Sequence, residues 1–170
     1  MKVEFLDDKK KAVVTYKKAY SILIHMKEAV RRHLEENVKM GILRKLKPGE
    51  DRHYWLSPML IIPKKNGEPR RVVDFKRLNS QCRRAINSSQ DTMRMAMSVL
   101  IARSKREKIY FSCLDAWNGY HSIPLEKTAE QYFGFLTEFG RYAYKVAPQG
   151  FLGSGDHYVG VYDDIMRKLQ

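Results

Sequence analysis

Residues 111–125, which read FSCLDAWNGYHSIPL, carry the most informative pattern of this 170-residue chain. The apolar run from Ile109 to Leu114 predicts a buried strand, and Asp115 follows directly at its end. A carboxylate placed at a strand end can bind Mg²⁺, which takes one or two protein oxygens and completes its octahedron with water and substrate phosphates. A single aspartate after a strand is more often a turn cap. The alternation from Tyr120 to Leu125 predicts a further strand.

A basic β-hairpin is predicted upstream of this stretch. Residues 57–63 form an apolar run bounded by prolines, Asn66-Gly67 favours a tight turn, and residues 70–75 provide the return strand. Four cations flank the turn, namely Lys64, Lys65, Arg70 and Arg71. Such a hairpin can close over phosphates, or it can be a solvated sheet edge that is protected from aggregation by its charge. The residue pattern alone leaves both interpretations open.

The remaining pattern indicates an α+β architecture without internal repeats. Apolar residues at every fourth position predict an amphipathic helix over 26–38, and a Met-rich helix is expected over 91–104. A second hairpin is expected from 131–137 and 141–146, followed by a glycine-rich loop over 148–155 and a helix over 156–169. Residues 1–25 are basic and weakly patterned, so we expect a poorly ordered arm with a short extended piece near 13–16.

The charge balance points to a polyanionic partner. Lys and Arg total 32 against 19 acidic residues, a formal net charge of +13. Such a surplus favours nucleic acid over an anionic membrane, although a solvated basic surface would show the same sign. The chain begins with a charged segment and has no apolar run of membrane-spanning length, so we expect an intracellular protein. Cys82 and Cys113 have no Cys or His partner at metal-ligand spacing and are expected to be reduced thiols.

Three motifs resemble those of the reverse transcriptases of long-terminal-repeat retrotransposons and retroviruses, and they occur in the same order along the chain as in that family. Residues 111–125 resemble the first catalytic motif of this family, with its apolar-Asp and Gly-Tyr-His elements. Residues 64–79, KKNGEPRRVVDFKRLN, resemble the fingers hairpin, and residues 147–151, APQGF, resemble the Pro-Gln-Gly loop. The resemblance covers residues 20–170 and implies a polymerase right-hand fold, with fingers and an incomplete palm over 26–170, built as an antiparallel sheet backed by helices.

The resemblance also implies a role for each matching residue. Asp115 would be the first metal-binding and catalytic aspartate, and the backbone carbonyl of Ala116 would be a second ligand of Mg²⁺ or Mn²⁺. Tyr120 would be the steric gate against a ribose 2′-hydroxyl. The remaining implied contacts are Lys64 and Arg70 to the incoming dNTP, Gln149 and Gly150 beside its sugar and the template base, and Lys65 and Arg71 to the RNA/DNA primer–template. His121 is expected to pack rather than to act in acid–base chemistry.

One family motif is not matched within these 170 residues. The aromatic-x-Asp-Asp hairpin, which supplies the remaining metal ligands, would follow beyond Gln170, as would the thumb and the ribonuclease H domain. Tyr162-Asp163-Asp164 lacks the spacer residue of that motif and falls in a predicted helix, where neighbouring side chains point about 100° apart. We therefore expect the chain to contribute to two-metal nucleotidyl transfer in an intact enzyme and to be inactive alone.

Two other functions fit parts of the pattern. The chain could be a non-catalytic nucleic-acid-binding relic or a co-opted remnant of a retroelement. A cellular or intron-encoded polymerase relative is the third interpretation, against which the Gly-Tyr-His string and the Arg-x-x-Val-Asp hairpin argue. The sequence indicates no oligomeric state.

Overall fold

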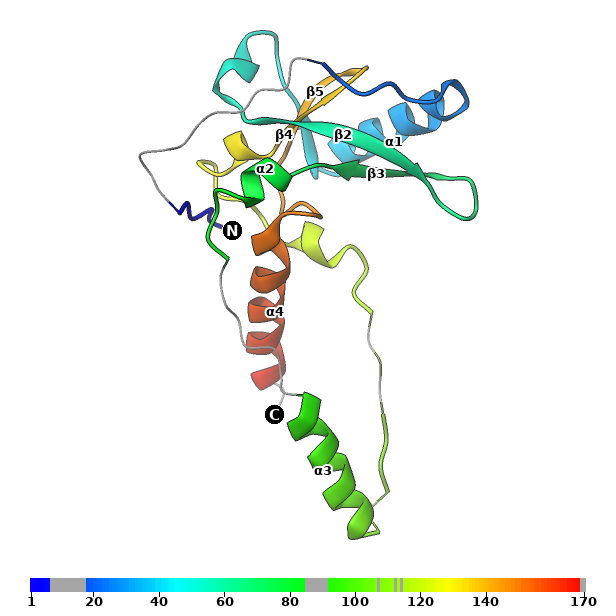
Figure 1. The fold of residues 1–170 in the computed structure, drawn as a ribbon, viewed down its shortest axis with the longest axis vertical. Helices are drawn as coiled ribbons and strands as arrows, with labels where there is room; N and C mark the ends of the chain where they lie inside the picture. The colour runs from blue at the N-terminus through cyan, green and yellow to red at the C-terminus, as the bar shows by residue number, and fades with distance from the viewer. Residues whose placement is uncertain (7–17, 85–91, 107, 112, 114, 169–170) are drawn as a thin grey trace.

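The computed structural model describes residues 1–6, 18–84, 92–106, 108–111, 113 and 115–168. Its centre is a five-stranded sheet in the order β1-β5-β4-β2-β3 (Figure 1). The strands are β1 (Leu43–Lys45), β2 (Leu56–Pro63), β3 (Pro69–Val73), β4 (Gly134–Thr137) and β5 (Gly140–Tyr144). All neighbours pair antiparallel except β2 and β4, which run parallel. The α+β class and the hairpins β2–β3 and β4–β5 are confirmed, whereas the expectation of a wholly antiparallel sheet is corrected at one pair.

The β2–β3 hairpin follows from its local sequence. Met59 pairs with Val73 and the ladder continues to Pro63 opposite Pro69. The side-chain oxygen of Asn66 accepts a hydrogen bond from the backbone N–H of Glu68 at 3.2 Å, and Gly67 has a φ of +81°. Asn and Gly meet the backbone requirements of such a turn without tertiary help, so the sequence predicts this element well.

Four α-helices join the sheet elements among the described residues: α1 (Lys27–Lys39), α2 (Lys76–Asn79), α3 (Thr92–Ser104) and α4 (Leu152–Arg167). Short 3₁₀ turns occur at η2 (Ile24–Met26), η3 (Glu50–His53), η4 (Gly119–Ser122) and η5 (Glu130–Tyr132). Helix α1 lies against β1 and β3 and buries Val30 and Leu34, as its apolar stripe predicts. None of the described helices is both long and apolar enough to cross a membrane.

Helix α4 begins four residues earlier than the sequence predicted. Its first turn is held from outside the helix: the Asn79 side-chain oxygen accepts a hydrogen bond from the Leu152 N–H at 3.0 Å. The Ser154 hydroxyl donates to the Pro148 carbonyl at 2.7 Å. These contacts stabilise a glycine-rich helix start whose own helix propensity is low.

Two predicted strands are not formed by the residues that the structure describes. Residues 109–111 and 113 pair with no other described strand, and Tyr110 and Phe111 are 83% and 72% exposed. Residues 119–122 form η4, and only an isolated bridge between Pro124 and Val146 follows. A strand requires hydrogen-bonding groups from a neighbouring strand, and the described residues offer none to the segment before Asp115.

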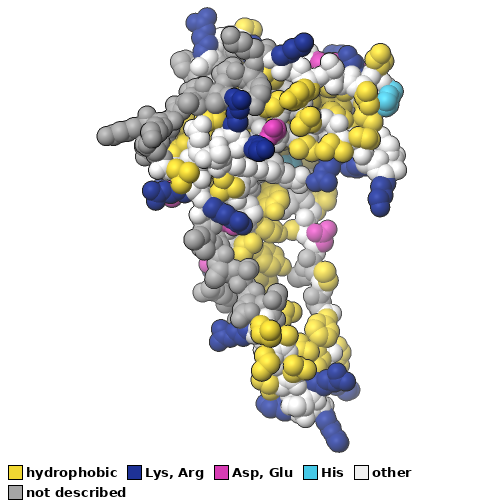
Figure 2. Space-filling view, viewed as in Figure 1, with side chains coloured by type: hydrophobic (Ala, Val, Ile, Leu, Met, Phe, Trp, Pro, Cys, Tyr) yellow, Lys and Arg dark blue, Asp and Glu magenta, His cyan; other side chains and the backbone are white. Residues whose placement is uncertain are grey.

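Helix α3 is formed, but it does not back the sheet as predicted. It extends away from the sheet beyond α4 (Figure 1). Its apolar side chains gather at the exposed far end of the molecule (Figure 2). The most exposed of them are Met93, Met95, Met97, Leu100 and Ile101. Helical spacing of apolar residues predicted the helix correctly, but it could not predict what the helix packs against.

The core lies between the sheet, α1 and the start of α4. Phe133 contacts Phe75 edge-on at 5.7 Å between ring centroids and Phe151 at 4.9 Å. Two residues of the expected N-terminal arm, Phe5 and Ile22, are buried in this core. The extended piece expected near residues 13–16 lies outside the described residues.

The two cysteines should differ sharply in reactivity. Burial raises the pKa of the Cys82 thiol to about 11, so its thiolate fraction at pH 8 is only ~0.1%. Cys113 is exposed on the segment that leads to Asp115. Titration of the folded chain with a thiol reagent at pH 8 should therefore modify one cysteine quickly, and the second only after urea unfolds the protein. Equal labelling rates in the folded state would contradict the burial of Cys82.

Candidate nucleotide and nucleic-acid site

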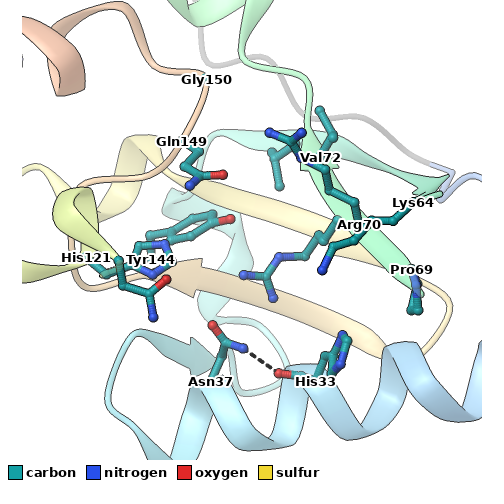
Figure 3. Close-up of a pocket in the computed structure, with 13 residues that line it drawn as sticks. His33, Asn37, Lys64, Pro69, Arg70, Val72, His121, Tyr144, Gln149 and Gly150 are labelled. Carbon is teal, nitrogen blue, oxygen red and sulfur yellow. Dashed lines mark hydrogen bonds between the residues drawn. The ribbon is translucent and has the colours of Figure 1, made fainter. Parts of the chain in front are cut away.

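A cavity of about 480 Å³ opens between the β2–β3 hairpin, helix α1, the segment before η4 and the loop after β5 (Figure 3). Segments that are far apart in the sequence line it. They include His33 and Asn37 from α1, Arg70 and Arg71 from β3, and Gln149 and Gly150 from the loop. Four of the residues that the sequence assigned to nucleotide binding thus meet at one place: Lys64, Arg70, Gln149 and Gly150.

The cavity is strongly electropositive. Lys64, Arg70 and Arg71 are among its lining residues, and none of the described residues that line it is Asp or Glu. The ammonium of Lys64 lies 3.2 Å from the Glu68 carboxylate, but both side chains are about half exposed. An ion pair in that position adds little stability and leaves Lys64 able to exchange its partner. The arrangement suits a ligand with several negative charges.

Asn79, the last residue of α2, holds the loop that carries Gln149 and Gly150. The Asn79 amide donates to the Gly150 carbonyl at 2.9 Å, while its oxygen accepts from Leu152 as described above. Gly150 has a φ of +92°, a backbone conformation that a side chain would strain. Sequence reasoning used Asn79 only as part of the hairpin motif. The only indication of its structural role in the sequence is its place as the last residue of that motif.

His121 lines the cavity although the sequence predicted only a packing role. Its Nδ1 atom is buried and has no hydrogen-bond partner among the described residues. Burial first, and then the nearby Arg71 guanidinium, lower the pKa of His121, which favours the neutral imidazole. His33 and Asn37 were not singled out by the sequence. On α1, the Asn37 amide donates to the His33 carbonyl at 2.6 Å (Figure 3).

Tyr120 is not among the residues that line the cavity, although its sequence neighbours Asn118 and His121 are. Its ring meets that of Tyr158 on α4 edge-on, with 5.6 Å between centroids. Asn118 adopts a left-handed conformation with a φ of +52°, and its carbonyl accepts a hydrogen bond from the His121 N–H at 2.8 Å. This turn, rather than the predicted strand, sets the position of Tyr120.

Asp115 and Ala116 are exposed and are not among the residues that line the cavity. The described residues contain no group of three or more His, Cys, Asp or Glu side chains that could hold a metal ion. Asp163 and Asp164 lie within α4, which confirms that they do not form a hairpin-tip carboxylate pair. The donor set of these residues therefore does not fit a two-metal centre. Lys65 is exposed at the tip of the hairpin.

Comparison with known families agrees with this geometry. The profile of the family described as "Reverse transcriptase (RNA-dependent DNA polymerase)" matches residues 62–170. The chain belongs to this family.

Its relatives include polyproteins of retroelements. The chain is 32% identical over 141 residues to the "Putative enzymatic polyprotein" of Cassava vein mosaic virus, covering 79% of the chain and 20% of that protein. It is 30% identical over 155 residues to the "Retrovirus-related Pol polyprotein from transposon opus" of Drosophila melanogaster, covering 90% of the chain and 15% of that protein. The chain thus spans about a fifth or less of these relatives.

Solved structures show the same fold. The native crystal structure of the prototype foamy virus protease–reverse transcriptase superposes with a TM-score of 0.70 at 18% identity, over 97% of this chain and 21% of that one. The foamy viral enzyme in complex with an RNA/DNA hybrid gives 0.68 at 18% identity, over 89% and 19%. The expected partial right-hand polymerase fold is confirmed.

Proposed function

We propose that this chain is the nucleotide- and template-binding part of a retroelement RNA-directed DNA polymerase. The convergence of Lys64, Arg70, Gln149 and Gly150 on one electropositive cavity carries the proposal. These residues come from two motifs that are about 80 positions apart in the chain and share no local structural constraint. Foamy viral relatives of the same fold were solved with double-stranded DNA and with an RNA/DNA hybrid, which supports a nucleic-acid partner.

Each cavity residue has a chemical role in the proposal. Arg70 grips phosphate oxygens through its planar guanidinium, and Lys64 acts as a point charge on the same dNTP. Gln149 and Gly150 lie beside the nucleotide sugar and the template base, where the glycine lets backbone approach closely. Tyr120 is the gate that excludes a ribose 2′-hydroxyl. Lys65, exposed at the hairpin tip, contacts the nucleic-acid backbone.

For the divalent metal, Mg²⁺ or Mn²⁺, we propose only part of the ligands. Asp115 and the Ala116 carbonyl would supply two oxygens, and the other carboxylates would have to come from outside the described residues. In this proposal the cavity binds the nucleotide, and the Asp115 carboxylate contributes separately to metal binding. Nucleotide and nucleic-acid binding can be tested without any metal chemistry.

Binding to primer–template duplex should be independent of sequence and should weaken steeply with salt. The chain carries a net charge of +13, and each phosphate that it neutralises releases a counterion. Reversing two cations, Lys64→Glu with Arg70→Glu, should weaken binding about tenfold or more and flatten the salt dependence. Fluorescence anisotropy with a labelled RNA/DNA duplex measures both effects over a series from about 50 to about 300 mM NaCl, in which such contacts are lost.

The matched control is Lys39→Glu with Arg103→Glu, which makes the same charge change at exposed positions of α1 and α3 outside the cavity. If this control weakens binding as much as the cavity variant does, the interaction depends on net charge and not on the proposed site. Affinity that stays flat across the salt series would exclude phosphate binding.

A non-catalytic nucleic-acid-binding role is the second candidate. This role needs only the cavity, whereas nucleotidyl transfer also needs carboxylates in addition to Asp115. The two functions share the same binding behaviour, and primer extension is the assay that distinguishes them.

A further inference from the structure

Arg71 occupies a strand position that normally holds an apolar residue. Side chains alternate along β3, so Arg71 shares the inward face of the hairpin with Pro69 and Val73, both of which are buried. Arg70, in contrast, is exposed on the opposite face. The two neighbouring arginines therefore reach the cavity from different sides, and Arg71 reaches it from the core.

Aromatic rings hold the Arg71 guanidinium in place. Its central carbon lies 5.6 Å from the ring centroid of Phe135 and 5.6 Å from that of Tyr144, both on the central strands of the sheet. Cation–π contact fixes the direction of the planar group and leaves its N–H donors unused. Within the described part of the chain, no carboxylate forms an ion pair with Arg71.

A half-buried cation without a counter-charge is unfavourable, because removing it from water is not offset by an ion pair. The cavity also contains the unpartnered buried Nδ1 of His121, and the His121 pKa is lowered partly by Arg71, so the two groups influence each other. Two independent hydrogen-bonding groups are thus unsatisfied in one electropositive cavity. A small anion bound between them would accept from both, with His121 in the tautomer that carries its proton on Nδ1.

We propose that Arg71 and His121 form the inner end of the cavity as a subsite for a terminal phosphate of a polyphosphate, such as the tail of a nucleoside triphosphate. The inference rests on the proposed function and adds to it a second anion contact, opposite Lys64 and Arg70. The cavity of about 480 Å³ can hold a nucleotide, and Arg71 reaches it from the inward face of β3, where a duplex bound at the exposed Lys64 and Arg70 would not extend. We therefore assign Arg71 to the small anion in place of the nucleic-acid contact suggested by its place in the basic hairpin.

The test uses metal-free inorganic tripolyphosphate as the probe and isothermal titration calorimetry as the measurement. The wild-type chain should bind it, and Arg71→Met should weaken binding about tenfold or more, because a charged, oriented donor is lost. Arg71→Lys, which keeps the charge but not the planar fork, should be intermediate. Arg103→Met on α3 removes the same charge outside the cavity and should stay within about twofold of wild type.

A second readout separates binding from folding. Arg71→Met replaces an uncompensated cation with an apolar side chain that packs on aromatic rings, so its thermal midpoint should equal or exceed that of the wild type. Tripolyphosphate should raise the midpoint of the wild type but not that of Arg71→Met. A structural role for Arg71 predicts the opposite, namely a lowered midpoint and unchanged tripolyphosphate binding.

The outcomes are distinct. Absence of tripolyphosphate binding in the wild type, or equal binding by wild type and Arg71→Met, overturns the inference. If Arg71→Met weakens RNA/DNA duplex binding while tripolyphosphate binding is kept, Arg71 contacts nucleic acid and the inference is wrong, although the proposed function stands. If duplex binding fails in the wild type itself, the proposed function fails first.

Discussion

Primer extension with Mg²⁺ or Mn²⁺ is expected to be absent from a polypeptide of residues 1–170. Two-metal nucleotidyl transfer needs several carboxylate oxygens to hold two ions about 4 Å apart. Asp115 is exposed and is not among the residues that line the nucleotide cavity, and Asp163 and Asp164 lie within α4. Mg²⁺ dehydrates reluctantly and binds poorly to a single carboxylate. The expected loss is complete, even though nucleotide and duplex binding remain.

The measurement is extension of a labelled DNA primer on an RNA template, next to an Asp115→Asn control. Fusion of the chain to a segment that supplies an aromatic-x-Asp-Asp hairpin should restore extension, and Asp115→Asn should abolish it again. Extension by the 170-residue polypeptide that disappears in the control would prove this expectation wrong. It would mean that the remaining metal ligands come from a second chain or from α4.

Gly134→Ala should strongly destabilise the fold. Gly134 opens β4 and pairs with Leu56 in the parallel β2–β4 ladder. A Cβ atom added there would lie 2.8 Å from the Trp55 carbonyl oxygen and 2.9 Å from a Leu56 methyl carbon. Backbone cannot yield to this contact as a flexible side chain could, so the two strands must separate. We expect a loss of about 2–3 kcal/mol in the free energy of unfolding, or failure to fold.

Gly155→Ala is the matched control. Its Cβ would lie 3.8 Å from the Tyr120 hydroxyl, an ordinary contact, and alanine favours the helix by roughly 0.5–1 kcal/mol. Urea unfolding followed by circular dichroism should show a lower midpoint for Gly134→Ala and an equal or higher midpoint for Gly155→Ala. A wild-type midpoint for Gly134→Ala would show that β2 and β4 are not packed as closely as the structure has them.

The sequence determined those features that depend on neighbouring residues. Asn66-Gly67 predicted the β2–β3 hairpin, and the every-fourth-residue stripe predicted α1, because turn geometry and helical periodicity are local properties. The three motifs also identified the family. They singled out Lys64, Arg70, Gln149 and Gly150 by residue type and order alone, and the fold brings these four residues to one cavity.

Tertiary structure alone decided the rest. The run before Asp115 has the composition of a strand, yet a strand forms only where another strand offers its hydrogen-bonding groups, and the described residues offer none there. Asn79 stabilises the early start of α4 from more than 70 positions away. The resemblance gave Arg71 a contact with the primer–template, and only the alternation of β3 places it on the inward face, against the rings of Phe135 and Tyr144. Partners brought together across the sheet determine these features, and a local pattern contains no information about such partners.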